Sequence, residues 1–281
     1  MDAGERHGCR ADGGNFLFEC PDIFELPLDG DAKNTRWILG AANTEYAVGT
    51  FDGQKFTAET SKLRGHRGGK PNARSYIDWD YYAPQTFSDE PHGRRVQIGW
   101  FQTLTPTMPF NQSMSIPTEL RLVSTPDGPR LTWTPVKELE ALREKSHILP
   151  AFTLAPNAAD LLAAITGELL EIRAEFEPRN AAEIAFNIRG VPVVFDAKKQ
   201  EIIVNGRRAP APLNKGRQRL TIFADRTGLE VFASDGLTFV SMPVNLNPDD
   251  HSLTVSAKDG SVSFIRLDVC ELRSIWAGIS N

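Results

Sequence analysis

The chain has 281 residues, of which 41% are hydrophobic and 24% are charged, and its formal net charge at pH 7 is -5. This size and composition are typical of a soluble globular protein with one large or two ordinary domains. The five histidines are scattered and there is no basic face that would follow a phosphate backbone, which argues against nucleic acid as a partner. A neutral or weakly polar substrate fits better.

The first residues of the chain and its cysteines are informative about the cellular location of the protein. No stretch approaches the roughly 18 consecutive apolar residues of a membrane helix, and the polar, Gly-rich segment from Met1 to Asn15 lacks the apolar middle of a signal peptide. We therefore expect no membrane partner, and a protein that is cytoplasmic as it stands or secreted if it is a fragment of a longer precursor. Cys9, Cys20 and Cys270 are odd in number and far apart, which indicates free thiols rather than a zinc site.

Short apolar runs separated by turn residues fill the first half of the chain. The runs are FLFECPDIF, RWILGAA, EYAVGTF, RRVQIGWF and PRLTWTP. Asp29-Gly30, Asp52-Gly53 and Asp127-Gly128 punctuate them as hairpin turns would. This pattern predicts antiparallel, blade-like sheets from about Phe16 to Trp133, although exact repeats are not visible.

A helical pattern follows these strands. Pro135 suits the first position of a helix that runs to Arg143, Leu139 and Leu142 share one face, and Thr134 is a suitable cap. We predict a helical connector in residues 135–150, which separates a partial β-propeller (1–134) from a β-sandwich (151–281).

The second half reads as a sandwich. From Glu168 onward, Leu170, Ile172, Ala174 and Phe176 alternate with charged residues, which predicts a half-buried strand. Further strands follow at intervals of about ten residues: AEIAFNIRG, VPVVF, EIIVNG, RLTIFAD, LEVFAS and SVSFIRLDV. The segment from Asn157 to Ile165 stays open between a helix and a bridge into the sandwich, because its Ala and Leu content favours helix.

One carboxylate stands out in the first predicted strand. Glu19 lies among Phe16, Leu17, Ile23 and Phe24, so it is either paired or raised in pKa by desolvation. An acid that stays protonated near neutral pH can donate a proton to a glycosidic oxygen. The alternative is that Glu19 faces solvent on a half-buried strand.

Glu19-Cys20-Pro21 matches a motif of glycoside hydrolase family 32, and the resemblance extends along nearly the whole chain from residue 16 to residue 270. The further matches, in chain order, are Tyr46–Phe56 (YAVGTFDGQKF), Tyr81–Phe87 (YYAPQTF), Arg94–Trp100 (RRVQIGW), Met114–Leu120 (MSIPTEL), Asp225–Phe232 (DRTGLEVF) and Asp235-Gly236. The chain thus resembles the C-terminal portion of a β-fructosidase of the levanase, inulinase and invertase type.

This resemblance implies an all-β architecture, in which an N-terminally truncated five-bladed β-propeller precedes a C-terminal β-sandwich. It implies that Glu19 is the general acid/base of a retaining reaction, in which an Asp nucleophile lies about 5 to 5.5 Å away. The implied partner is a fructose-containing oligo- or polysaccharide. The implied enzyme uses no metal and no organic cofactor.

The chain departs from the family pattern at its beginning. The motifs that carry the nucleophile and the stabilising Asp, Trp-Met-Asn-Asp-Pro-Asn-Gly and Arg-Asp-Pro, are absent, and only fifteen residues precede Phe16. The chain is then a deletion variant, a gene fragment or one piece of a longer protein, and we expect its own activity to be very low.

Other residues are weaker candidates for contact with substrate. Tyr81 and Tyr82 can stack on a sugar or bond to its hydroxyls, although aromatic residues in such strands more often form the core. Asp80 and Trp79 share that segment, and Cys20 is expected to tune Glu19 as a buried thiol.

A basic loop and two tryptophans have simpler interpretations. The segment Arg64 to Lys70, with His66 and Arg67, is either an anion site or, more simply, a solvated loop. Trp100 and Trp133 end strands and are expected to pack.

Three functions remain open. The chain belongs to a fructan-cleaving lineage with Glu19 as acid/base, it is a non-catalytic fructan-binding or structural remnant, or it is a homo-oligomer whose copies complete the propeller.

Overall fold

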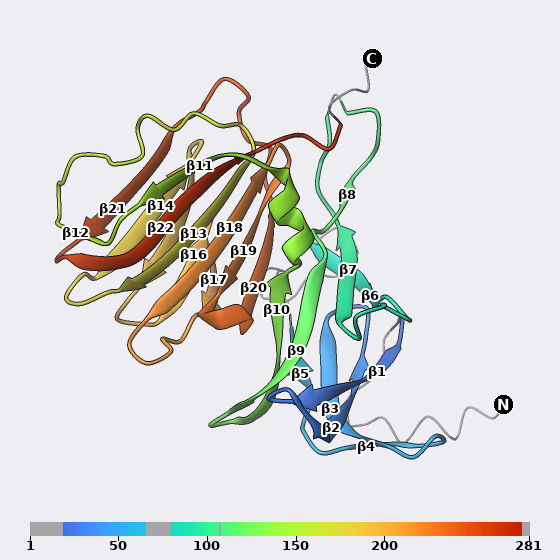
Figure 1. Cartoon of the computed structure of the whole chain (residues 1–281). Helices are drawn as coiled ribbons and strands as arrows, with labels where there is room; N and C mark the ends of the chain where they lie inside the picture. Colours follow the sequence, from blue (N-terminus) through green and yellow to red (C-terminus); the bar gives the residue numbers. More distant parts are fainter. Residues whose placement is uncertain (1–18, 66–79, 107, 277–281) are drawn as a thin grey trace. The chain divides into compact units, whose positions relative to one another are not determined.

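The computed structural model describes residues 19–65, 80–106 and 108–276 (Figure 1). These residues form strands and connecting turns, with two short 3-10 helices as the helical elements. The chain divides into two compact units, one of residues 1–102 and 113–136 and one of residues 103–112 and 137–281. The predicted all-β fold class is confirmed.

The first unit is built from two antiparallel meanders of four strands each. The first meander contains β1 (Asp22–Leu28), β2 (Asp31–Gly40), β3 (Glu45–Phe51) and β4 (Phe56–Ala58). The second contains β6 (Tyr81–Thr86), β7 (Arg95–Phe101), β9 (Thr118–Thr125) and β10 (Gly128–Pro135). The short strands β5 (Leu63–Arg64) and β8 (Ser113–Met114) pair with β3 and β7. Four-stranded antiparallel sheets of this kind are the units of a propeller.

A single parallel contact between Leu28 and Leu122 joins β1 to β9 and makes the two meanders one ten-stranded sheet. The hairpin between β1 and β2 turns at Asp29 and Gly30, whose φ angles are 54° and 80°. Positive φ at both positions is what a tight two-residue turn requires, and Asp-Gly meets it at low cost. The turn predicted from this dipeptide is therefore confirmed.

The interior of the first unit contains polar groups that are bonded to each other. Trp133 is buried and its Nε1 donates to Oε1 of Gln97 at 3.0 Å, and the buried Tyr81 hydroxyl donates to the same oxygen at 3.3 Å. The Tyr46 hydroxyl accepts a hydrogen bond from the backbone N of Leu131 at 3.1 Å. The packing role predicted for Trp133 is confirmed.

The connecting helix begins later than predicted. Thr134 and Pro135 belong to β10, where they pair with Glu119 and Thr118, and the helix is a 3-10 helix, η3 (Lys137–Leu142), with no buried residue. The prediction of a helix start at Pro135 was wrong because pairing with β9 holds that residue extended.

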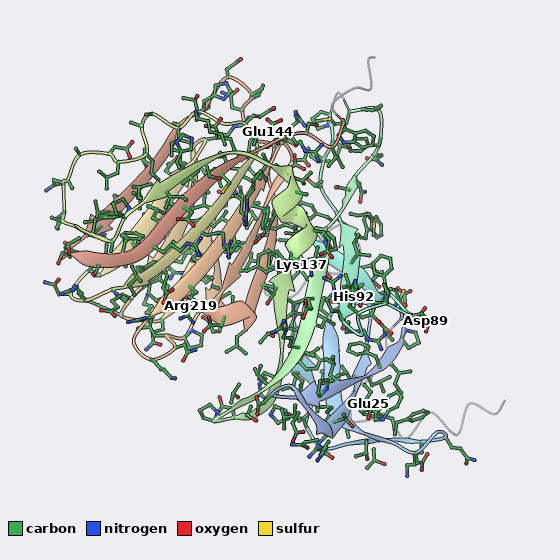
Figure 2. The ribbon with its side chains drawn as sticks, in the orientation of Figure 1. Glu25, Asp89, His92, Lys137, Glu144 and Arg219 are labelled. Atoms are coloured by element: carbon green, nitrogen blue, oxygen red, sulfur yellow. The ribbon has the colours of Figure 1, made fainter. Side chains whose placement is uncertain are left out.

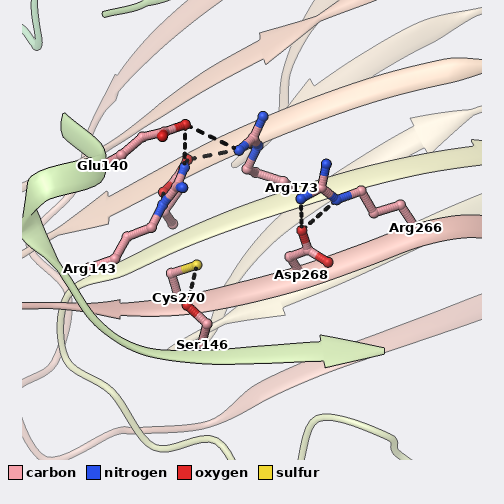
Figure 3. A network of polar contacts seen from close by, with 8 residues as sticks. Glu140, Arg143, Ser146, Arg173, Arg266, Asp268 and Cys270 are labelled. Carbon is pink, nitrogen blue, oxygen red and sulfur yellow. Dashed lines mark hydrogen bonds and ion pairs between the residues drawn. The ribbon is translucent and has the colours of Figure 1, made fainter. Parts of the chain in front are cut away.

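Ion pairs attach η3 to the sheet that follows it. Arg143 binds Glu171 at 2.5 Å and 2.7 Å and Glu140 at 3.3 Å, and Arg173 contacts Glu140 at 3.6 Å (Figure 3). The Glu171 side chain is 5% exposed, so its charge depends on Arg143 for compensation.

The second unit is a sandwich of two antiparallel sheets. The larger sheet contains β11 (Arg143–Leu149), β12 (Phe152–Leu154), β13 (Leu170–Glu177), β18 (Gln218–Asp225), β19 (Gly228–Ala233), β20 (Thr238–Pro243) and β22 (Val262–Leu272). The smaller sheet contains β14 (Glu183–Ile188), β15 (Val191–Asp196), β16 (Glu201–Val204), β17 (Arg207–Pro210) and β21 (Leu253–Lys258). A 3-10 turn, η4 (Ser234–Gly236), connects β19 to β20. The predicted two-sheet sandwich is confirmed.

Aromatic side chains from both sheets form the centre of this core. The ring of Phe176 lies 5.7 Å from that of Phe195 and 5.4 Å from that of Phe264. The segment 157–165, which the sequence left open, is neither helix nor strand, and it places Leu162 and Ile165 in the core. Of the two alternatives, this segment is therefore the non-helical bridge into the sandwich.

Candidate active site

The Glu19 segment lies just before β1, and the structure differs here from the sequence-based expectation. Glu19 and Cys20 are both exposed and precede the strand, which begins at Asp22. The expected apolar enclosure of Glu19 and the expected buried thiol of Cys20 are therefore not observed. Cys20 has a φ of 46°, a left-handed conformation that turns the chain ahead of Pro21 and so interrupts the strand.

Strand β6 holds this segment through side chains and backbone. The Tyr82 hydroxyl donates to the Glu19 carboxylate, and Gln85 Nε2 donates to the backbone oxygen of Cys20 at 3.1 Å. The backbone N of Thr86 donates to the Asp22 carboxylate at 2.8 Å. Three residues of one strand thus fix both the backbone and the carboxylate of the Glu-Cys-Pro motif.

A local irregularity in β6 makes these contacts possible. The pairing of β6 with β7 shifts register between Tyr82 and Gln85, and Ala83 between them has a φ of 48°. The backbone N of Ala83 donates to Ala42 O at 2.9 Å, and Ala42 N donates to Glu19 O at 2.8 Å. A bulge of this kind turns side chains away from a regular alternation, and such features are common beside active sites.

Three of the predicted substrate contacts, Tyr81, Tyr82 and Asp80, are buried residues. Tyr81 is 2% exposed, and a Cβ added at Gly99 would lie 2.6 Å from its ring, so Gly99 provides the space that the ring fills. Asp80 is 5% exposed, and its backbone oxygen accepts a hydrogen bond from Gln102 N at 3.1 Å. Tyr82 is 3% exposed as well, but its hydroxyl reaches the Glu19 carboxylate, whereas Tyr81 and Asp80 are buried away from it.

Trp100 is a candidate site residue that the sequence-based interpretation missed. We expected it to pack, yet it is 38% exposed, and its ring lies edge-on to Tyr82 with centroids 6.4 Å apart. The signal was present in the alternation of β7, because the neighbours of Trp100, Gly99 and Phe101, are both buried. Side chains of successive strand residues point to opposite faces, so Trp100 had to face away from that interior.

The cavity inside the first unit is too small for a sugar. It has a volume of about 20 Å³ and is lined by residues that include Thr44, Tyr81, Gln97 and Trp133. Roughly one water molecule fits in such a space. The surface that exposes Glu19 and Trp100 is therefore the better candidate for contact with a substrate.

Several of the remaining predictions concern residues 1–18 and 66–79, which lie outside the described residues. These are the thiol of Cys9, Trp79, and the His66 and Arg67 part of the basic loop. Cys20 and Cys270 are free cysteines, as predicted. In the described part of the chain, no three residues of the His, Cys, Asp and Glu types come together as a metal site. No helix in that part is long and apolar enough to cross a membrane.

Comparison with known proteins agrees with this arrangement. The family model for the glycosyl hydrolases family 32 N-terminal domain matches residues 5–135, and the model for the family 32 C-terminal domain matches residues 138–271. A levanase from Bacillus subtilis (strain 168) is 31% identical over 302 residues, which cover 92% of this chain and 43% of that protein. An extracellular exo-inulinase from Aspergillus ficuum is 25% identical and is covered over 56% of its length.

The fold agrees as well. The crystal structure of an exo-inulinase from Aspergillus awamori matches with a TM-score of 0.74 at 23% sequence identity, over 92% of this chain and 57% of that one. The chain spans about half the length of the relatives that it matches. Its two family matches lie in the expected order and together include most of its residues. This chain belongs to glycoside hydrolase family 32.

Proposed function

We propose that this chain is the part of a retaining β-fructosidase that carries the general acid/base, and that its substrate is a fructose-containing oligo- or polysaccharide. The contact between Tyr82 and Glu19 is the observation that carries the proposal. It places an exposed carboxylate in a defined orientation, on a segment that β6 also holds through Gln85 and Thr86. The names of two relatives, a levanase and an exo-inulinase, support a fructan as the substrate.

In this proposal Glu19 donates a proton to the leaving oxygen as its bond to the anomeric carbon breaks and the nucleophilic carboxylate bonds to that carbon. In the second half of the reaction the Glu19 carboxylate takes a proton from water, whose oxygen attacks the anomeric carbon and displaces the nucleophile. Tyr82 orients the carboxylate through its hydroxyl, and the half-exposed ring of Trp100 offers an apolar surface to the sugar. No metal ion or organic cofactor enters any of these steps.

These 281 residues do not contain the motif that carries the nucleophile in this family. A retaining glycosidase needs a second carboxylate about 5 to 5.5 Å from the acid, and the Asn-Asp-Pro motif of the family is absent from these 281 residues. Loss of a nucleophile costs many orders of magnitude in rate, whereas an acid contributes on the order of 10² to 10⁴. We therefore expect this chain alone to hydrolyse sucrose, levan and inulin negligibly.

An assay of reducing-sugar release tests the proposal. It compares the wild-type chain with Glu19→Gln on sucrose, levan and inulin. Negligible release by both is the expected result for the isolated chain. Addition of a polypeptide with the Asn-Asp-Pro motif should restore turnover to the wild type, and much less to Glu19→Gln. Tyr82→Phe keeps the ring and should give an intermediate rate. Turnover by the wild-type chain alone that Glu19→Gln abolishes would instead show that another carboxylate, such as one from a second copy, acts as nucleophile.

A non-catalytic remnant that binds fructan is the second candidate. The exposure of Trp100 beside Tyr82 favours it, because an open aromatic surface can hold a sugar without any nucleophile. Failure to restore turnover with the added polypeptide, together with measurable fructan binding, would favour this candidate over the first.

A further inference from the structure

Two aromatic rings from distant parts of the sequence stack on the surface of the second unit. Phe110 lies in the loop of residues 103–112 and Trp276 lies after the last strand, β22. Their ring centroids are 5.7 Å apart and their planes are inclined by 21°. Figure 1 shows the loop and the C-terminal segment side by side. Phe110 remains 37% exposed and Trp276 50% exposed, although a stack already uses one face of each ring.

Hydrogen bonds fix the backbone near both rings. The Thr103 hydroxyl donates to Thr227 O at 2.6 Å, which fixes the start of the loop to the sandwich. Within the loop, the Thr105 hydroxyl donates to Phe110 O at 3.0 Å and accepts from Gln112 N at 2.9 Å. On the other side, Arg273 N donates to Leu142 O at 2.9 Å. Rings fixed in this way lose little conformational freedom when a ligand binds.

Two large apolar side chains close to the stack in sequence are exposed as well. Leu104, in the same loop as Phe110, is 77% exposed, and Ile275, next to Trp276, is 70% exposed. Large apolar side chains that gather at the surface usually mark a place of contact with another molecule.

The size of the stack argues against a protein as its occupant. A large aromatic side chain has roughly 150–250 Å² of surface, so the exposed fractions of the two rings leave on the order of 150 Å² open. A stable protein interface buries roughly 800 Å² on each partner. Even with Leu104 and Ile275 added, the exposed apolar area stays below this value, and it suits a few sugar units.

We propose that the Phe110–Trp276 stack is a binding platform for a stretch of a fructan chain. This inference rests on the proposed function, which it deepens by naming a polymer rather than a disaccharide as the ligand. A sugar ring carries C–H groups on its faces and hydroxyl groups at its rim. The C–H groups, which are slightly positive, lie against the negative face of an aromatic ring, while the hydroxyl groups stay in water.

Electrophoresis of the 281-residue chain in native gels tests the platform. The gels contain levan, inulin or no polysaccharide, and migration relative to a non-binding marker protein gives an apparent affinity. We expect at least one of the fructans to retard the wild type. Trp276→Ala should weaken the apparent affinity about tenfold, since it removes the larger ring of the stack, and Phe110→Ala should weaken it less.

Two further variants keep the result interpretable. Ile148→Ala removes an apolar side chain that is 72% exposed on β11 of the second unit, away in sequence from the stack, and it should migrate as the wild type does. Trp276→Phe retains an aromatic ring and should preserve most of the retardation, even if Trp276→Ala is less stable in a thermal melt. Retardation of Trp276→Ala and Phe110→Ala equal to that of the wild type would overturn the platform, as would a wild type that neither fructan retards.

Hydrolysis measured in parallel separates this inference from the proposed function. One outcome is that the chain mixed with the polypeptide that carries the Asn-Asp-Pro motif releases fructose while Trp276→Ala and Phe110→Ala migrate as the wild type does. In that case the proposed function stands and the platform fails. If fructan retards the chain through Trp276 and no fructose is ever released, the platform stands and the hydrolytic function fails.

Discussion

Glu19 owes its position to residues that lie more than sixty places away in the sequence. Tyr82, Gln85 and Thr86 contact the short segment from Glu19 to Asp22, and each uses a different kind of group, namely a hydroxyl, a side-chain amide and a backbone N–H. The sequence neighbours of Glu19 predicted an apolar enclosure, whereas the chain turns at Cys20 and leaves the carboxylate exposed. A carboxylate in this position can meet a substrate without a large rearrangement.

A second residue with an unusual role is Arg189 in the sandwich. It is 3% exposed, and its guanidinium donates to the backbone oxygens of Asp250 at 2.8 Å, Glu168 at 3.1 Å and Asn247 at 2.5 Å. Burial lowers the pKa of this guanidinium, although nearby acidic groups oppose the effect. One side chain therefore ties two separate loops to the turn between β14 and β15.

We predict that Arg189→Met destabilises the sandwich by about 2–4 kcal/mol, because three carbonyl oxygens lose the charged donor that the buried guanidinium provides. The midpoint of thermal unfolding should fall by roughly 5–15 °C. Arg208→Met is the matched control, since Arg208 is 52% exposed in its ion pair with Glu201 and should contribute less than about 1 kcal/mol. Equal midpoints for the two variants would contradict this role of Arg189.

Charged side chains link the neighbouring strands β11 and β22 in the second unit. The link between β11 and β22 has a polar example, in which His147 Nε2 contacts Glu271 Oε1 at 2.7 Å and Lys145 Nζ contacts the same oxygen at 3.1 Å. The hydrogen bond with His147 lowers the pKa of Glu271, partial burial opposes this, and Lys145 lowers it further.

This shift makes the pairing of β11 sensitive to acid. A carboxylate whose pKa is lowered by folding adds stability above its unfolded pKa, about 4.3, and this stability is lost as the pH falls through the folded value. The difference in unfolding midpoint between the wild type and Glu271→Gln should therefore be present at pH 6 and should close below about pH 4. We expect up to about 1 kcal/mol, since both side chains are partly exposed. A difference that is the same at pH 3 and pH 6 would contradict the assignment.

The turn between β6 and β7 also contains a carboxylate whose pKa is lowered by hydrogen bonds. Asp89 and His92 lie in this turn (Figure 2). The Glu90 carboxylate accepts from the backbone N of His92 at 2.8 Å and from Arg94 N at 2.9 Å. Desolvation opposes ionisation, but the hydrogen bonds from Arg94 and His92 lower the pKa of Glu90 to about 2. The turn thus keeps its charge-dependent hydrogen bonds over the ordinary pH range.

At the scale of the whole molecule, the exposed apolar residues of the first unit bear on its state in solution. Ile23 is 40% exposed, Phe87 52%, Trp100 38% and Met114 54%. We predict that the chain associates with itself through such residues and buries more than roughly 1,000 Å² in doing so. Light scattering coupled to size exclusion at micromolar concentration should give a mass above that of one chain. Phe87→Ser with Met114→Ser should shift the equilibrium toward the monomer, and a wild type that is strictly monomeric would contradict the prediction.

The positions of most strands and turns followed from the sequence by itself, because both depend on local rules. Alternation along Leu170–Phe176 places every second residue in the core whatever the neighbouring strand is, and Asp29-Gly30 adopts its turn because of its own backbone preferences. The family also followed from motifs that are contiguous in the chain.

What the tertiary structure decided depends on contacts between residues far apart in sequence. The loop 103–112 belongs to the second unit, Pro135 belongs to β10, and Asp80, Tyr81 and Tyr82 are buried. The tertiary structure also brings Tyr82 to Glu19 and Phe110 to Trp276. Local patterns determine which face of a strand is apolar, but the partner that covers this face, or leaves a carboxylate open, is set by packing across the whole chain.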